Sequence, residues 1–217
     1  MFENYLDTYS YSFYSNTCYK LKNCGFNPKN ILDIGASLCQ TADIMREVWP
    51  KSNILLFEGN KAFENTYKEK KYNYHIKLLG NQNGFVNFYQ TKWSKFCSGN
   101  SIYREKSISY NNDEVIIESL PIYKLDDIVS TKYDLIKIDT QGSELDIIKG
   151  GIKIFNDAKV IICEVALIDI NTGGCTKEDI VNILTKQLKF DYVDIIEKVF
   201  HNDNKTIAYE NLMFIKP

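Results

Sequence analysis

Residues 31–40 read Ile-Leu-Asp-Ile-Gly-Ala-Ser-Leu-Cys-Gln, a short apolar run that passes through one glycine into helix-forming sequence. Apolar residues then recur at helical spacing and predict a helix with one buried face: Leu38, Ala42, Met45 and Trp49. Pro50 ends that helix. A strand that enters a helix through a glycine turn is typical of nucleotide-binding α/β folds. The helix N-terminus then points backbone N–H groups at a ligand beyond the strand.

Composition narrows the class of protein. The chain has 217 residues and a formal net charge of −2, which suits one α/β domain and gives no basic field for nucleic acid. No apolar run approaches the ~20 residues of a transmembrane helix. Residues 1–15 lack a signal-peptide pattern, and the six cysteines show no C-x-x-C spacing. We therefore expect a cytoplasmic protein with reduced thiols, no membrane span and no nucleic-acid partner.

The remaining sequence divides into an extension and a domain. Residues 1–27 form a Tyr-rich segment with helical character, and residues 28–217 form the expected domain. Strands are expected at Asn30–Ile34, Asn53–Phe57, Tyr74–Leu79, Phe85–Gln90, Glu114–Pro121, Leu135–Ile138, Val160–Cys163, Tyr192–Val199 and Thr206–Ile215. Their alternation with helices predicts a mostly parallel sheet with helices on both faces, and the last two strands, joined by a polar turn, predict one antiparallel strand at an edge.

One long stretch, residues 91–114, loses all periodicity. It is longer than most connections in compact domains, and ordered loops of this length are commonly lids or binding loops. A surface excursion without a functional part is the alternative.

Acidic residues follow four of the expected parallel strands, namely Asp33, Glu58, Asp139 and Glu164. Ligands of open α/β sheets bind beyond these strand ends, so the crevice is acidic and disfavours a central phosphate. The chain has no P-loop, and the dinucleotide fingerprint G-x-G-x-x-G fails because Ser37 and Gln40 replace the second and third glycines.

S-adenosylmethionine meets these conditions because it carries a cationic sulfur and no phosphate. A carboxylate at the end of the second strand can hold its ribose diol, and Glu58 follows Asp33 at about the spacing of one strand–helix–strand step. A plain surface acid is the alternative for Glu58.

The motifs together resemble the FkbM-type methyltransferases, a branch of the class I S-adenosylmethionine-dependent family. The matching segments, in chain order, are Leu32–Ser37 with Gln40, Phe57-Glu58, Asn83–Tyr89, Ser98–Tyr103, Leu125–Asp127, Ile136–Glu144 with Lys149-Gly150, Glu164 and Leu212–Phe214. The block Lys-Ile-Asp-x-x-Gly-x-Glu over 137–144 is the most specific. The chain departs from the family at Gly59, where proline is usual, and at Leu79-Gly80-Asn81, where Ala-Leu is usual.

The resemblance implies a Rossmann-like, seven-stranded fold and methyl transfer to a hydroxyl of a sugar or another small metabolite. The cofactor-binding residues it implies are Asp33, Gly35, Ala36, Ser37, Gln40, Glu58, Gly59, Gly80, Asn81 and Asp139. Asp139 is the first candidate for the general base, Glu164 the second and Glu144 the third. The expected substrate-binding residues are Ser98, Asn100, Ser101 and Glu144.

Several alternatives stay open at this point. Asp139 has a structural acid as its alternative role, and Lys137 is expected to point away or to pair with an acid. A non-catalytic methyltransferase-like domain is a second function, and an N-methyltransferase a third, although residues 139–142 lack the Asp/Asn-Pro-Pro-Tyr motif. No spacing demands a metal, so we expect none, while a divalent ion held by the carboxylates is the alternative. The sequence identifies neither the acceptor nor the oligomeric state.

Overall fold

The main element of the structure is a seven-stranded sheet. A computed structural model describes residues 3–97, 99–107, 110–111, 113–200 and 205–217. The strand order is β3-β2-β1-β7-β8-β10-β9, with bounds Asn73–Ile76, Asn53–Glu58, Asn30–Ile34, Leu135–Ile138, Val160–Ala166, Ile207–Ile215 and Asp191–Phe200. Within this sheet β10 runs antiparallel to both β8 and β9, and the other pairs are parallel. The mostly parallel sheet is confirmed, and its antiparallel strand belongs to the edge hairpin, one position in from β9.

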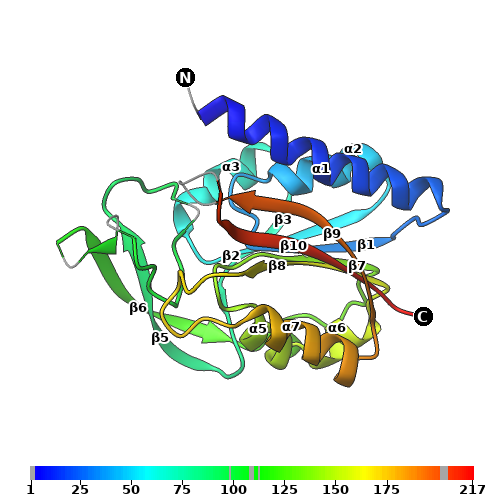
Figure 1. Cartoon of the computed structure of the whole chain (residues 1–217). Coiled ribbons are helices and arrows are strands. Elements are labelled where there is room, and N and C mark those ends of the chain that lie inside the picture. Colours follow the sequence, from blue (N-terminus) through cyan, green and yellow to red (C-terminus); the bar gives the residue numbers. More distant parts are fainter. Residues whose placement is uncertain (1–2, 98, 108–109, 112, 201–204) are drawn as a thin grey trace.

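Helices cover both faces of the sheet, as the sequence predicts. Figure 1 shows α1, α2 and α3 on one face and α5, α6 and α7 on the other. Their bounds are Glu3–Asn23, Gln40–Val48, Glu64–Glu69, Glu144–Gly150, Ile152–Asp157 and Lys177–Asn182. Short helical turns lie at Lys61–Phe63, at α4 (Leu125–Ile128) and at Ile183–Gln187. Because α2 begins only at Gln40, Leu38 precedes it and is 39% exposed, so the expectation that Leu38 joins the buried face is wrong.

Each strand contributes to two cores because its side chains alternate between the faces. Leu32 and Ile34 pack on the α5–α7 side, whereas Ile31 packs on the α1–α2 side. In β7, Ile136 and Ile138 repeat this pattern on the α5–α7 side. The near-continuous apolar runs of the sequence follow from this double burial.

The N-terminal segment forms one continuous helix, α1. Its Tyr14, Cys18 and Leu21 are buried in the same core as α2, and α1 also contacts β9. No helix among the described residues combines the length and apolar character needed to cross a bilayer.

A second sheet of three strands stands beside the first and projects from it in Figure 1. Its order is β4-β6-β5, with bounds Leu78–Leu79, Val115–Tyr123 and Gly84–Thr91. The expected strand Tyr74–Leu79 is thus divided, since β3 pairs with β2 while β4 pairs with β6. The sequence does not reveal this division because the apolar run is continuous and only its pairing partners change.

Candidate functional site

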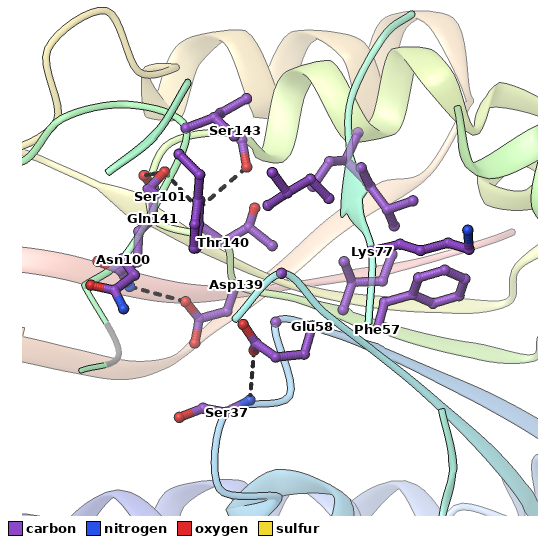
Figure 2. Close-up of a pocket in the computed structure, with 18 of the residues that line it drawn as sticks. Ser37, Phe57, Glu58, Lys77, Asn100, Ser101, Asp139, Thr140, Gln141 and Ser143 are labelled. Carbon is purple, nitrogen blue, oxygen red and sulfur yellow. Dashed lines mark hydrogen bonds between the residues drawn. The ribbon is translucent and has the colours of Figure 1, made fainter. Parts of the chain in front are cut away.

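A cavity opens at the carboxyl ends of β1, β2 and β7. It holds about 880 Å³ of empty space, part of it open to solvent. Its walls come from the turns after these three strands, from β4, and from Cys97, Asn100, Ser101 and Ile102. Figure 2 shows that Glu58 and Asp139 point into the same space from different strands. The cavity therefore lies at the edge of the sheet where α/β proteins bind ligands.

The turn after β1 is held in an unusual backbone conformation. Gly35 has φ +78°, and a Cβ atom there would lie 1.7 Å from the carbonyl oxygen of Asp139, so only glycine fits. Ser37 and Cys39 also have positive φ values, 45° and 68°. Buried Tyr67 donates a hydrogen bond to the Ser37 carbonyl over 2.8 Å and fixes the turn. Strained residues that the fold stabilises in this way are common at ligand sites.

Backbone N–H groups hold both carboxylate oxygens of Glu58 in place. Its Oε2 accepts from the Ser37 N–H at 3.0 Å, drawn as a dashed line between the two labelled residues in Figure 2, and its Oε1 accepts from the Asn60 N–H at 2.8 Å. Burial raises the pKa of Glu58, and these N–H groups counteract that rise. Each carboxylate oxygen keeps a further acceptor site, so Glu58 can also bind two hydroxyl groups.

Asp139 and Glu164 form a carboxyl pair bridged by Gln141. The Gln141 side-chain amide donates to Asp139 Oδ1 at 3.1 Å and to Glu164 Oε2 at 2.8 Å. Burial and the Asp139 charge raise the pKa of Glu164 well above its usual value. Burial also opposes ionisation of Asp139, but Lys137 and hydrogen bonds outweigh it and hold the pKa of Asp139 below its usual value. These opposite shifts make Asp139 the member of the pair that ionises more readily.

Lys137 is the buried cation of the site, with only 5% of its side chain exposed. Its ammonium lies 3.3 Å from Asp139 Oδ2 and 3.5 Å from Asp33 Oδ1, and it donates to the Gly35 carbonyl at 3.0 Å. The expectation that Lys137 pairs with an acid is confirmed. Asp33 is fully buried and contacts this ammonium, so its effect on a ligand passes through Lys137 and the turn.

Four described residues of the segment after β5 line the cavity, namely Cys97, Asn100, Ser101 and Ile102. Ser101 lines it and donates to the Gln141 carbonyl at 2.9 Å. Asn100 accepts from the Tyr110 hydroxyl at 2.8 Å, while its buried side-chain nitrogen has no partner among the described residues. An unused donor at a cavity wall suits a ligand oxygen. Ser98, also expected to bind substrate, lies outside the described residues.

The structure separates the expected site residues into three groups. The main cavity is lined by Gly35, Ser37, Glu58, Gly59, Asn100, Ser101, Asp139 and Glu164. An adjoining chamber is lined by Ala36 and Gln40. Gly80 and Asn81 line neither, and Asn81 instead donates to Asp146 at 2.7 Å.

Glu144 lies behind the turn rather than in the cavity. Its carboxylate accepts from the Thr140 N–H at 2.7 Å and from the Gly142 N–H at 3.0 Å, so it fixes the backbone that presents Gln141. Its contacts are those of a structural acid.

Other residues line the two cavities without having been predicted as site residues. Leu78 and Phe88 form an apolar wall of the main cavity, and Tyr14 and Asn211 line the adjoining chamber. Gln141 lies inside the 137–144 block and Phe88 inside the matching segment Asn83–Tyr89, whereas Leu78, Tyr14 and Asn211 carry no signal in the sequence. No cluster of three or more potential metal ligands occurs in the described part of the chain.

Comparison with known proteins places this geometry in a family. A model of the FkbM methyltransferase domain matches residues 24–196. The chain belongs to the FkbM methyltransferase family. Its Glu58 and Asp139, which face one cavity, both lie within the matched segment. No curated protein sequence matches the chain.

Solved structures share the fold of this FkbM methyltransferase domain. The FkbM methyltransferase of Methylobacillus flagellatus is 14% identical, covers 86% of this chain and has a TM-score of 0.54. The chain spans 43% of that protein's length. The plantazolicin methyltransferase BpumL, solved in complex with a monoazolic desmethylPZN analog and SAH, is 11% identical, with 97% of this chain and 85% of that chain covered and a TM-score of 0.53. An O-methyltransferase-like protein of Klebsiella pneumoniae is 10% identical, with 94% and 80% covered and a TM-score of 0.51.

Proposed function

We propose that the chain is an S-adenosylmethionine-dependent O-methyltransferase that acts on a hydroxyl group of a sugar or another small metabolite. The observation that carries the proposal is the placement of Glu58 and the Asp139–Glu164 pair around one cavity. Glu58 is a preoriented acceptor for a ribose diol. The charged end of the cavity, around Asp139, complements a cationic sulfur. These residues fit S-adenosylmethionine, and the family supports the same cofactor.

The cofactor supplies an activated methyl group, which moves from its sulfonium to the acceptor oxygen and leaves S-adenosylhomocysteine. The residues of the chain must align the reacting atoms and exclude water. Gly35 lets the β1 turn approach β7 closely, and Asn100 and Ser101 cover the cavity. The Asn100 amide nitrogen is a donor that can orient an acceptor oxygen.

Asp139 is the group that takes the acceptor's proton. Its carboxylate keeps its charge because of Lys137, and 28% of its side chain remains accessible at the cavity. Gln141 fixes one of its oxygens. A charged carboxylate suits deprotonation of a hydroxyl, which general-base catalysis accelerates by about 10²–10⁴-fold. The charged carboxylate and the absence of an Asp/Asn-Pro-Pro-Tyr motif at residues 139–142 both favour oxygen over nitrogen as the acceptor atom.

Calorimetric titration with S-adenosylhomocysteine tests the cofactor assignment. We expect the wild-type chain to bind it and Glu58→Ala to bind about 10- to 100-fold more weakly, because a hydrogen-bonded charged acceptor is removed. Glu69→Ala, which changes an exposed glutamate in α3, is the matched control and should bind as the wild type does. Absence of binding at millimolar ligand, or equal affinities of wild type and Glu58→Ala, would refute the proposal.

The acceptor class is tested separately. The chain is incubated with methyl-labelled cofactor and a panel of sugars, hydroxylated metabolites and amines, and labelled products are identified by mass spectrometry. Label on hydroxyl groups is expected. Label confined to amines would refute O-methylation but keep the methyltransferase assignment. Binding without turnover on any member would favour the non-catalytic alternative.

A further inference from the structure

A chamber rich in lysine lies where the main sheet meets the second sheet. It contains about 930 Å³ of empty space, part of it open to solvent. Its walls come from residues 59–62 after β2, from the end of β3, and from the strands of the second sheet. Three of its residues are lysines, and we call it the lysine chamber: Lys61, Lys77 and Lys95. Among the described site residues that the sequence predicts, it includes only Gly59.

We propose that the lysine chamber binds a small organic molecule that carries a phosphate group. The site is additional to the one that holds the methyl donor, and no step of methyl transfer takes place in it. The inference therefore goes beyond the proposed function and can fail independently of it.

The formal charge of the lysine chamber is positive. Its three ammonium groups face one carboxylate, that of Glu118, which accepts from the Gln90 side-chain amide at 3.2 Å. The ion pairs found among the described residues involve none of the three lysines. An anionic ligand is therefore complementary to this chamber.

Lys77 lies at the boundary and belongs to the walls of both the main cavity and the lysine chamber. Figure 2 shows its side chain extending away from Glu58 and Asp139. Its ammonium lies 4.0 Å from the centroid of the Tyr123 ring, which lines only the lysine chamber of the two. The Lys77 backbone N–H donates to the Glu58 carbonyl at 2.8 Å and fixes the main chain. The charge of Lys77 is thus directed to the lysine chamber and away from the carboxyl groups of the main cavity.

The number of cations favours phosphate over a carboxylate. The three lysines come from separate segments, after β2, between β3 and β4, and after β5. A phosphate monoester carries a charge of about −1.5 to −2 at pH 7 and three strong acceptor oxygens. A carboxylate has one charge and two oxygens, so it would leave more of the positive charge unbalanced.

The lysine chamber also has an apolar side. Its apolar residues include Ile76, Leu78, Phe88, Leu120 and Pro121. Inorganic phosphate would leave this surface in contact with water, whereas an organic group would cover it and gain about 25 cal/mol for each Å² of apolar surface. The chamber therefore favours a phosphate that is attached to an organic body.

Calorimetric titration with three probes tests both parts of the ligand. The probes are 1-naphthyl phosphate, 1-naphthol, which lacks the phosphate, and inorganic phosphate, which lacks the organic body. We expect 1-naphthyl phosphate to bind at least about tenfold more tightly than either of the others, because each of them loses one set of contacts. Equal affinity for 1-naphthyl phosphate and 1-naphthol would overturn the inference, and so would equal affinity for 1-naphthyl phosphate and inorganic phosphate.

Lysine variants test the location. Lys77→Met should weaken 1-naphthyl phosphate by about tenfold, because a charged donor is removed. Lys61→Met and Lys95→Met should each weaken it by more than about threefold, and both lysines are exposed, so the fold should tolerate these changes. Lys186→Met is the matched control, since it removes an exposed lysine of the turn Ile183–Gln187, outside the chamber, and it should bind as the wild type does. Equal weakening by Lys186→Met and Lys77→Met would overturn the inference.

Competition separates this site from that of the methyl donor. Saturating S-adenosylhomocysteine should leave the affinity for 1-naphthyl phosphate within about tenfold, because the two ligands occupy different cavities. A larger loss would place the probe in the main cavity and overturn the inference. Absence of 1-naphthyl phosphate binding at millimolar concentration would also overturn it and leave the proposed function intact. Failure of S-adenosylhomocysteine alone to bind would refute the proposed function, and the lysine variants would still decide this inference.

Discussion

Replacement of Lys137 by methionine probes the charge balance of the site directly. Methionine keeps much of the aliphatic volume but removes the ammonium that contacts Asp139 at 3.3 Å, Asp33 at 3.5 Å and the Gly35 carbonyl at 3.0 Å. Buried Asp33 and half-buried Asp139 then lose their cation, and the Gly35 carbonyl loses its donor. We expect Lys137→Met to destabilise the fold and to disorder the β1 turn.

The expected size follows from the burial of the group. Breaking a buried ion pair by removing one partner costs about 3–5 kcal/mol. In a domain of this length 1 kcal/mol shifts the melting temperature by about 2–4 °C, so the expected decrease is about 6–20 °C. Lys132→Met is the control, because its ion pair with Asp157 is at the surface and its side chain is 79% exposed. Exposed pairs contribute about 0–1 kcal/mol, so this variant should melt within a few degrees of wild type.

The pH dependence distinguishes lost charge from lost packing. In the wild type Lys137 holds the pKa of Asp139 below its usual value, so Asp139 stabilises the fold above its unfolded pKa, and this contribution is lost as the pH falls through the folded value. The pKa of Lys137 is raised, because Asp139 and Asp33 outweigh its burial, so it stays charged at neutral pH. Without Lys137, burial raises the pKa of Asp139, so this carboxyl binds a proton more readily in the folded variant. As the pH falls, this protonation removes the unpaired charge, and the destabilisation of the variant becomes smaller.

Thermal unfolding of both proteins is therefore measured between about pH 8 and about pH 5. The difference in melting temperature should be largest near the upper limit and smaller near the lower one. A difference that stays constant across this range would show that lost packing, and not unpaired charge, explains the effect. A decrease no larger than that of Lys132→Met would refute the buried ion pair itself.

Two further variants test the turn and the base. Gly35→Ala should lower the melting temperature and abolish S-adenosylhomocysteine binding, since the new Cβ would lie 1.7 Å from the Asp139 carbonyl oxygen. Gly25→Ala is the control, because Gly25 has φ +89° with open space around it. This control variant should lose only the ~1–2 kcal/mol of stability that left-handed strain costs. Equal effects of the two variants would refute the steric explanation. Asp139→Asn should lower turnover of an acceptor found in the panel by about 10²–10⁴-fold, and a loss below about tenfold would remove Asp139 as the general base.

The sequence predicts the main sheet because local and tertiary preferences agree there. Leu32 and Ile34 are buried between two helical layers, and their apolar character alone indicates a parallel strand. The same reasoning misses the second sheet, since Leu78 and Leu79 continue the apolar run of β3 but pair with Ile122 and Tyr123, more than 40 residues away. A change of pairing partner leaves no local signal.

The site shows the same division between local and distant information. Glu58 and Asp139 follow predictable strands, so their convergence at one sheet edge can be derived from the sequence. Gly80 also follows a predicted strand, but the division of that strand after β3 directs it away from the cavity. Tyr14 joins the adjoining chamber only because α1 packs against the hairpin β9–β10, and periodicity cannot indicate which surface a helix will cover.

The polar groups of the site are also a consequence of strand register. Asp33 of β1 pairs with Lys137 of β7, and Glu164 of β8 pairs with Asn211 of β10. Their side chains therefore lie on the α1–α2 face, opposite to the Ile136 and Ile138 face. A slip of one residue would place these polar groups in the apolar core beneath α5. Burying such groups is expensive, and replacing the whole set together by apolar residues of similar size would cost little, although removing Lys137 alone would not. Their presence therefore favours a role in ligand binding over one in stability.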